Sequence, residues 1–402
     1  MISMSARTLL ALVIGIAALS TPARAAFTPK RPLVVVHYMP WFEAKPASGN
    51  WGWHWTMNFF DPDKASEGRR QIASHYYPLI GPYDSGDAAT IEYHLLLMKL
   101  AGIDGVIVDW YGTSDFQDYP TLHRNTVAVF KAAKRLGLRF GICYEDQTIP
   151  KLVEANRFAA GDRATQAQRD LEWMRQNWFG DPAYLRLNGK PVLLSFGSGG
   201  LSDVEWTQVL HASSPDILYL SEHRKRASAA GSFDWPRPEI GTAQQDGYNQ
   251  VIHDKAGQGS TVYVPVAFPR FQDIYKEARV SDSFGSIADD QGRTFAHTLD
   301  QAWKSGTSLL QIATWNDWGE GTVIEPSKEF GYRDLETLQK LRHAGDAQYH
   351  ALAEDLRIPY RVWLLRARED REPQLKSRLD TIVHLLVTGD MSRARSALKA
   401  IP

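Results

Sequence analysis

The sequence contains a single cysteine, Cys143, among its 402 residues. No disulfide can therefore form within the chain, and a fold held together by cystines is excluded. Cys143 lies inside the apolar run Phe140–Tyr144. A small buried hydrophobic side chain is expected there rather than a reactive nucleophile.

The chain also has no excess of positive or negative charge, because its formal net charge is −1. The segment from Trp41 to Thr56 is rich in tryptophan, but Lys45 is its only lysine or arginine. Proteins that stack nucleic-acid bases on aromatic rings need such cations beside the rings. We therefore predict no nucleic-acid partner.

Motifs for metals and nucleotides are absent. The 12 histidines include no His-x-His and no His-Glu-x-x-His pair, so we predict no metal and no cofactor. No glycine-rich phosphate loop follows the first expected strand, which weighs against a nucleotide-binding protein.

The N-terminus lacks an apolar run long enough to span a bilayer comfortably, because Leu9–Leu19 has only eleven residues. Arg7 precedes this run, and Ala23-Arg24-Ala25 follows it as a small-x-small cleavage site. We expect residues 1–25 to be a bacterial signal peptide. The protein is then periplasmic or secreted, with no membrane partner after cleavage.

Short apolar runs alternate with longer amphipathic segments along the rest of the chain. Eight runs are expected to be buried strands: Pro32–Tyr38, Gly105–Tyr111, Leu138–Tyr144, Pro191–Phe196, Ile217–His223, Ser232–Trp235, Val262–Phe268 and a run from Leu309. Such alternation is typical of α/β proteins with a parallel sheet, and the number favours a (β/α)8 (TIM) barrel over an open sheet. We expect the barrel over residues 26–345 and a C-terminal helical extension over 346–402.

The run from Leu309 ends in Trp315-Asn316-Asp317-Trp318-Gly319-Glu320, with two carboxylates three residues apart. A wet, glycine-rich turn can carry Asp and Glu without function, but the two tryptophans are harder to explain that way. In such barrels the site lies where the strands end. We predict that Asp317 and Glu320 are a catalytic pair.

The other strand ends add acids and aromatic rings but few cations. The residues predicted to bind substrate are Tyr38, Trp41, Asp109, Trp110, Tyr111, Glu145, Asp146, Glu222, His223, Trp315, Asn316 and Trp318. Glycoside hydrolysis needs such a site, because one carboxyl group protonates the leaving oxygen and a second assists attack. Surrounding indoles raise the pKa of the acid. Asp109 has a structural alternative as a cap, and Trp51, Trp53 and Trp55 either line a further subsite or pin a long loop.

Four separated stretches resemble glycoside hydrolase family 99, which contains endo-α-1,2-mannosidases and mannanases. They are Tyr38-Met39-Pro40-Trp41-Phe42 with Tyr76–Ser85, Ala101–Tyr111, and Trp315–Pro326, in the order of the family. The resemblance implies that Glu320 is the general acid/base. The residue matching Asp317 assists the 2-hydroxyl of the sugar, so the configuration is retained through a 1,2-anhydro sugar.

Two positions depart from that pattern. Asp317 stands where the family has Glu, one methylene longer, and Gly319 stands where bacterial mannan-cleaving members have His. A catalytic group displaced by about 1 Å can lose about a hundredfold in rate. The sugar and linkage therefore stay open, and α-1,3-glucanases of family 71 and barrels of polysaccharide biosynthesis share a similar motif.

The sequence thus predicts an oligo- or polysaccharide as the partner of an exported, metal-independent glycoside hydrolase. Two alternatives use the same barrel: a non-catalytic glycan-binding or polysaccharide-assembly protein, and a transglycosylase. A binding protein has no need of paired acids. The first alternative is therefore separated by asking whether Asp317 and Glu320 face one pocket.

Overall fold

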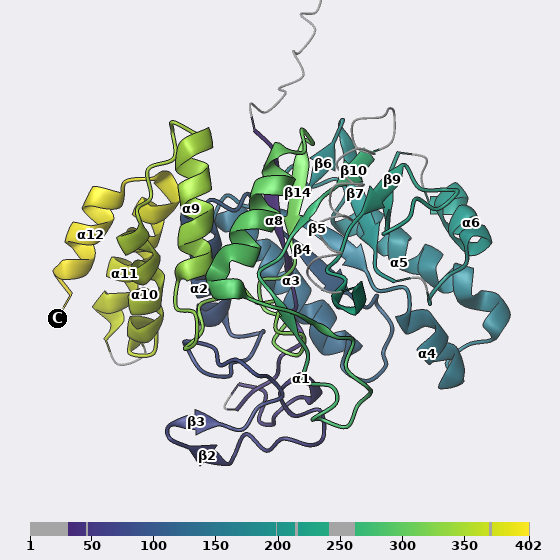
Figure 1. Cartoon of the computed structure of the whole chain (residues 1–402), viewed down its shortest axis with the longest axis horizontal. Coiled ribbons are helices and arrows are strands. Elements are labelled where there is room, and N and C mark those ends of the chain that lie inside the picture. The colour runs from purple at the N-terminus through teal and green to yellow at the C-terminus, as the bar shows by residue number, and fades with distance from the viewer. Residues whose placement is uncertain are drawn as a thin grey trace, which may run out of the picture. The chain divides into compact units, whose positions relative to one another are not determined.

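The computed structural model describes residues 31–45, 47–197, 199–213, 216–240, 262–369 and 372–401. From Arg31 onward, parallel strands form a barrel that is surrounded by helices (Figure 1). In the order in which neighbours pair, the strands are β10 (Val262–Val264), β9 (Gly231–Phe233), β8 (Leu218–Glu222), β7 (Lys190–Ser195), β5 (Arg139–Tyr144), β4 (Gly105–Trp110), β1 (Leu33–Tyr38), β14 (Leu309–Ile312) and β11 (Val266–Ala267).

The barrel closes through an interrupted strand. Only Pro265 separates β10 from β11, and the two halves pair with different neighbours, β10 with β9 and β11 with β14. Proline has no N–H to give to the ladder, so the strand breaks there. The eight expected strands and the (β/α)8 barrel are confirmed, and the sixth strand lies at Gly231–Phe233.

Helices follow most strands, and most of them cover the outside of the barrel. They are α1 (Trp53–Thr56), α2 (Ala88–Ala101), α3 (Tyr119–Arg135), α4 (Thr148–Glu154), α5 (Arg163–Asn177), α6 (Asp203–Ser213), α8 (Arg293–Lys304), α9 (Arg333–Gly345), α10 (Ile358–Arg366), α11 (Pro373–Thr388) and α12 (Met391–Lys399). The side chain of Asp87 caps α2 by accepting from Thr90 N–H, and Gly102 ends it at φ 87°. Glycine has no Cβ atom and adopts this left-handed backbone conformation at little energetic cost, so the helix ends there.

Short antiparallel pieces complete the loops. These are β2 (Ala65–Ser66), β3 (Arg69–Arg70), β6 (Arg186–Leu187), β12 (Phe271–Gln272) and β13 (Ser286–Ile287). The excursion between β1 and α2, which contains α1, β2 and β3, lies at the lower end of the barrel in Figure 1.

Side chains alternate between the two faces of each strand, so the hydrophobic core has two layers. Val34 and Val36 of β1 belong to the layer between sheet and helices, whereas Val35 belongs to the barrel interior. In β4, Val106 and Val108 face outward and Ile107 faces inward. Both faces of a parallel strand are buried, which explains why these runs are continuously apolar.

The C-terminal helices pack against α2, as Figure 1 shows for α10 and α11. Helix α2 is therefore buried on nearly all sides, which matches its apolar sequence. Glu92 of α2 is buried and pairs with Arg366 of α10 over 2.8 Å. The residues from Arg31 onward form one compact unit that includes these helices.

The expected signal peptide, residues 1–25, lies outside the described residues. Within the described residues, every helix is too short or too polar to cross a bilayer.

Candidate active site

The turn after β14 presents the two predicted catalytic carboxylates. The hydroxyl of Thr314 accepts from the backbone N–H of Asp317 over 2.8 Å, and its oxygen lies 3.0 Å from that of Thr322. Oδ1 of Asp317 in turn accepts from the N–H of Glu320 over 3.1 Å. The turn is therefore held by its own side chains, which fixes where Glu320 leaves the backbone.

Both carboxylates line one pocket at the carboxyl ends of the strands. The pocket holds about 690 Å³, including the space open to solvent at its mouth. Its walls are Met39, Trp41, Phe42, Trp53, His54, Met57, Asp109, Tyr111, Glu145, Gln147, Phe196, Trp235, Tyr275, Asp317, Gly319 and Glu320. The predicted site residues among them are Trp41, Asp109, Tyr111, Glu145, Asp317 and Glu320.

Burial sets the acidity of the pair. It raises the pKa of Asp317 to about 7, with a further contribution from the charge of Asp109. Burial and the neighbouring charge of Asp317 raise the pKa of Glu320 well above its ordinary value. Both carboxyl groups are therefore weaker acids than usual, which suits groups that exchange protons with a substrate.

Two further carboxylates, Asp109 and Glu145, come from β4 and from the residue after β5. Burial and then the charge of Asp109 raise the pKa of Glu145 well above its ordinary value. The amide of Gln147 donates to Glu145 over 2.7 Å. The pocket thus offers several oxygens that can donate or accept hydrogen bonds to sugar hydroxyls.

Tyr275 was not predicted, although its hydroxyl lies 3.5 Å from Oε1 of Glu320. Burial, followed by the charges of Glu320 and Asp317, raises its pKa well above the ordinary value. The hydroxyl is therefore a donor at working pH. The sequence feature that could have pointed to Tyr275 is its position in the loop after the seventh strand. Such loops lie at the active face of a barrel.

Three of the residues predicted to bind substrate have side chains that point away from the barrel interior. The hydroxyl of Tyr38 lies 3.1 Å from Nδ1 of His94, and the indole of Trp110 donates to His123 over 3.1 Å. Asp146 accepts from Trp206 over 2.7 Å, and burial raises its pKa to about 6. They do not line the pocket, because adjacent strand residues point to opposite faces.

The residues Trp315, Asn316 and Trp318 are fully buried and support the pocket from behind. The amide of Asn316 binds both the N–H and the C=O of Met39, over 2.8 and 2.9 Å. It thereby fixes the end of β1 against the turn that carries Asp317 and Glu320. Trp318 and Asn316 also donate to the hydroxyl of Tyr83, over 3.2 and 3.0 Å.

Glu222 and His223 end β8 beside the pocket but do not line it. Glu222 accepts from the N–H of Gly197 over 2.9 Å, and His223 lies 3.2 Å from Oδ1 of Asp234. Burial raises the pKa of Glu222, and its charge contributes to the raised pKa of Glu320.

The three alternating tryptophans have different environments. Trp55 is fully buried and donates to the carbonyl of Tyr83, so it pins the loop. Trp53 is 40% exposed and lines the pocket. Trp51 donates to Asp63 over 2.9 Å, outside the pocket wall.

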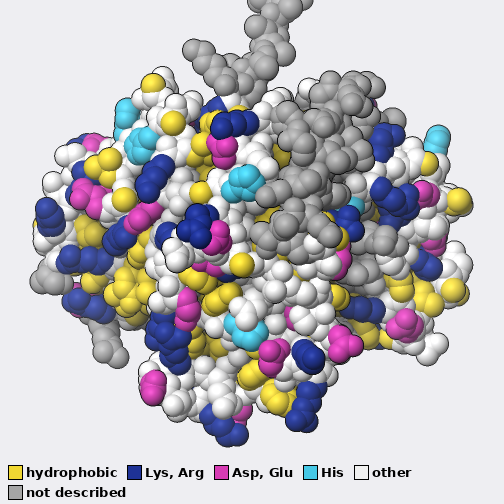
Figure 2. All heavy atoms as spheres, in the orientation of Figure 1, with side chains coloured by type: hydrophobic (Ala, Val, Ile, Leu, Met, Phe, Trp, Pro, Cys, Tyr) yellow, Lys and Arg dark blue, Asp and Glu magenta, His cyan; other side chains and the backbone are white. Residues whose placement is uncertain are grey.

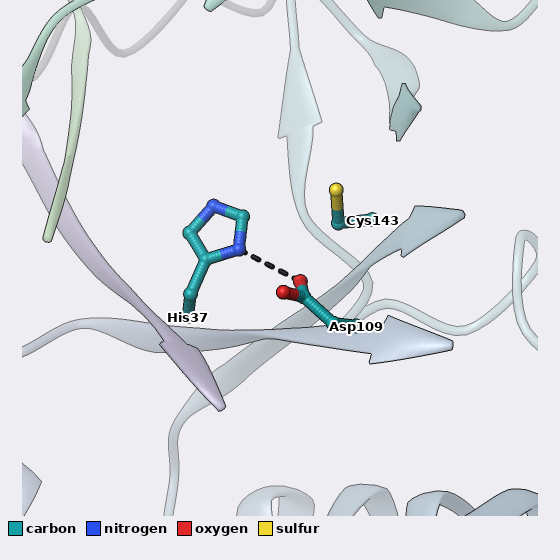
Figure 3. Close-up of side chains that lie close together, drawn as sticks. All are labelled: His37, Asp109 and Cys143. Carbon is teal, nitrogen blue, oxygen red and sulfur yellow. Dashed lines mark hydrogen bonds and ion pairs between the residues drawn. The ribbon is translucent and has the colours of Figure 1, made fainter. Parts of the chain in front are cut away.

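One cluster among the described residues has ligand atoms close enough for a metal. His37, Asp109 and Cys143 offer atoms within 4.8 Å of one another (Figure 3). Nδ1 of His37, however, lies 2.8 Å from Oδ1 of Asp109, as a hydrogen bond. Burial and the nearby acids raise the pKa of the Cys143 thiol well above its ordinary value, which opposes the thiolate that a metal requires. The arrangement fits a hydrogen-bonded cluster.

Charges of both signs are interspersed over the described part of the face in Figure 2, in agreement with the net charge of −1. The described atoms of this face therefore show no broad basic surface for a polyanion.

Comparison with known proteins shows the same fold and a resemblance to one family over part of the chain. Residues 30–224 match the model of Glycosyl hydrolase family 99, a segment that ends before the catalytic turn. A Glycoprotein endo-alpha-1,2-mannosidase-like protein of Danio rerio is 23% identical over 63% of this chain and 60% of its own length. Uncharacterized protein WxcX of Xanthomonas campestris is 20% identical over 92% of this chain and 58% of its own length. The chain thus spans about three fifths of these relatives.

Among solved structures, a GH99 endo-alpha-mannosidase from Bacteroides thetaiotaomicron superposes with a TM-score of 0.59 and 18% identity. The superposition covers 83% of this chain and 98% of that one. A glycoside hydrolase-like protein superposes with a TM-score of 0.53 and 13% identity, over 80% and 97% of the two chains. The chain therefore resembles glycosyl hydrolase family 99 in sequence over residues 30–224, and it shares the barrel fold of the family 99 structure.

Proposed function

We propose that this protein is a retaining glycoside hydrolase that cleaves an α-linked glycan. The observation that carries the proposal is the placement of Asp317 and Glu320 in one pocket with raised pKa values. A glycan-binding protein on the same barrel has no use for two such acids, so this geometry favours the enzyme.

Each carboxylate has a distinct role in the proposed reaction. Glu320 gives its proton to the glycosidic oxygen as the bond to the anomeric carbon breaks. Asp317 takes the proton of the sugar 2-hydroxyl, whose oxygen bonds to the anomeric carbon and forms the 1,2-anhydro sugar of the resemblance to family 99. Water then attacks the anomeric carbon and gives a proton to Glu320, while the bond from that carbon to the 2-oxygen breaks and Asp317 returns its proton to the 2-oxygen, so the configuration is retained.

The lining also bears on the substrate. Four carboxylates and neither lysine nor arginine are among the described residues of the pocket wall. An anionic sugar is repelled by such a wall, so a neutral sugar fits better. The named family 99 relatives are mannosidases, but Asp317 and Gly319 reshape the catalytic turn, and we leave the sugar to experiment.

We further propose that the protein is exported. The support is the sequence pattern of residues 1–25, in which Arg7, an apolar run and an Ala-Arg-Ala site follow one another. Fractionation of cells that express the full chain, with N-terminal sequencing, tests this. An intact N-terminus in the cytoplasm refutes it.

Product analysis tests the activity. The mature protein is incubated with α-mannans, α-glucans and bacterial exopolysaccharides, beside the matched variant Glu320→Gln, which keeps the shape of the side chain. Loss of the acid is expected to slow release of sugars about 100-fold or more. Equal release by both proteins refutes the assignment of Glu320, and tight binding without release favours the glycan-binding protein. New, longer saccharides identify a transglycosylase.

A further inference from the structure

A chain of hydrogen bonds below the pocket fixes the protons of His37. The amide nitrogen of Gln311 donates to the backbone carbonyl of Asp234. A carbonyl only accepts, so this contact sets the orientation of the Gln311 amide and turns Oε1 toward His37. Nε2 of His37 lies 3.0 Å from that oxygen and must therefore carry a hydrogen.

The other ring nitrogen also faces an acceptor. Nδ1 of His37 lies 2.8 Å from Oδ1 of Asp109, and both side chains are almost completely buried (Figure 3). A hydrogen bond at this contact needs a second proton, in addition to the one on Nε2. Imidazole is ordinarily a stronger base than a carboxylate, so the ring is the better place for it.

We propose that His37 is a positioning residue whose imidazolium, imposed by Gln311, neutralises Asp109 beneath the catalytic pair. The expected effect on catalysis rests on the proposed function. The number of protons on the His37 ring does not depend on that function. The aromatic surroundings agree with a fixed ring, since the ring of Trp235 packs edge-on at 4.6 Å from His37.

Neutralising Asp109 matters because its carboxylate lines the pocket together with Asp317 and Glu145. An uncompensated charge on Asp109 disfavours ionisation of Asp317, the group that must act as base. The titratable groups whose charges interact with that of Asp109 are Tyr111, Cys143, Glu145, Glu222 and Asp317. All five are acids, and His223 contacts Glu222 and Asp234 rather than Asp109. His37 is therefore the base in direct contact with Asp109.

Nitrogen-15 NMR of histidine-labelled protein at pH 7 tests the proton count without any substrate. The signal that disappears in His37→Gln identifies the residue. Both ring nitrogens of His37 are expected to be protonated in the wild type. In Gln311→Met, which removes the acceptor, one nitrogen is expected to lose its proton. A bare Nδ1 in the wild type overturns the proposal, whether or not the protein hydrolyses glycans.

The pH profile of kcat/KM tests the consequence once a substrate is known. In Gln311→Met the limb that reports ionisation of the base is expected to move upward by about one pH unit. Cys143→Ala is the comparison variant, because it removes only the weak thiol contact with Asp109 and leaves the contact between Gln311 and His37 in place. An unshifted limb in a folded Gln311→Met protein, shown by thermal unfolding, contradicts the role of His37, since a purely structural contact changes stability alone.

Discussion

The backbone N–H of Glu320 donates to Oδ1 of Asp317 over 3.1 Å, so the acid is held in place by its partner. The same carboxylate that must act as a base also caps the turn that carries the acid. Changes at Asp317 therefore act on both geometry and charge, and Asp317→Asn is the change that keeps the acceptor oxygen while removing the charge.

The activity is expected to have an optimum at neutral pH or above. Its rate should rise as Asp317, with a pKa of about 7, loses its proton. It should fall at higher pH, when Glu320 loses the proton that its raised pKa retains. Measurements of kcat/KM from pH 4 to 10 check this, and an optimum near pH 4 contradicts it.

Asp317→Asn is expected to stabilise the fold at alkaline pH. Burial places the folded-state pKa at about 7, above the ordinary 3.8. Between these values the folded protein holds a proton that the unfolded chain has lost, so the free energy of unfolding falls as the pH rises. Asparagine cannot ionise, so the variant does not lose this free energy of unfolding as the pH rises. Thermal unfolding at pH 4 and pH 8 should show a larger gain for the variant at pH 8, and equal differences at both pH values contradict the buried charge.

Gly319→Ala is expected to narrow the pocket without unfolding the protein. A Cβ atom there would lie 3.0 Å from Cε of Met57 and 3.5 Å from Oδ1 of Asp317. The methionine end is flexible and can shift. We expect KM to rise about fivefold, which is about 1 kcal/mol, with little change in melting temperature. Met57→Ala in the same chain should restore KM, and failure to do so points to a backbone effect.

Trp53 and Trp55 should separate substrate binding from stability. Trp53→Ala removes an exposed ring of the pocket wall, so KM should rise while the melting temperature changes little. Trp55→Ala removes a buried ring and should cost about 3–5 kcal/mol of unfolding free energy. Kinetics and denaturant unfolding of both variants check this. A strongly destabilised Trp53→Ala protein means that both rings pin the loop.

The same alternation that organises the barrel decides which predicted residues reach the pocket. Asp109 and Trp110 are adjacent at the end of β4, but only Asp109 faces the interior, and Trp110 packs against the helices. The residue pattern marks both as strand-end residues. Once one inward-facing residue of a strand is known, alternation gives the orientation of the other side chains. Which residue faces inward depends, however, on how the strands tilt as the barrel closes.

The sequence alone determined the barrel, and it predicted a catalytic role for the turn that carries Asp317 and Glu320, because both inferences rest on local patterns. Strands that are buried on both faces must be apolar throughout, and Asp317 and Glu320 follow the last one directly. Only the tertiary structure brought Tyr275 to 3.5 Å from Glu320 and His37 to 2.8 Å from Asp109. These contacts join segments far apart in the chain. The raised pKa values likewise arise from burial, which exists only once the barrel has closed around the pair.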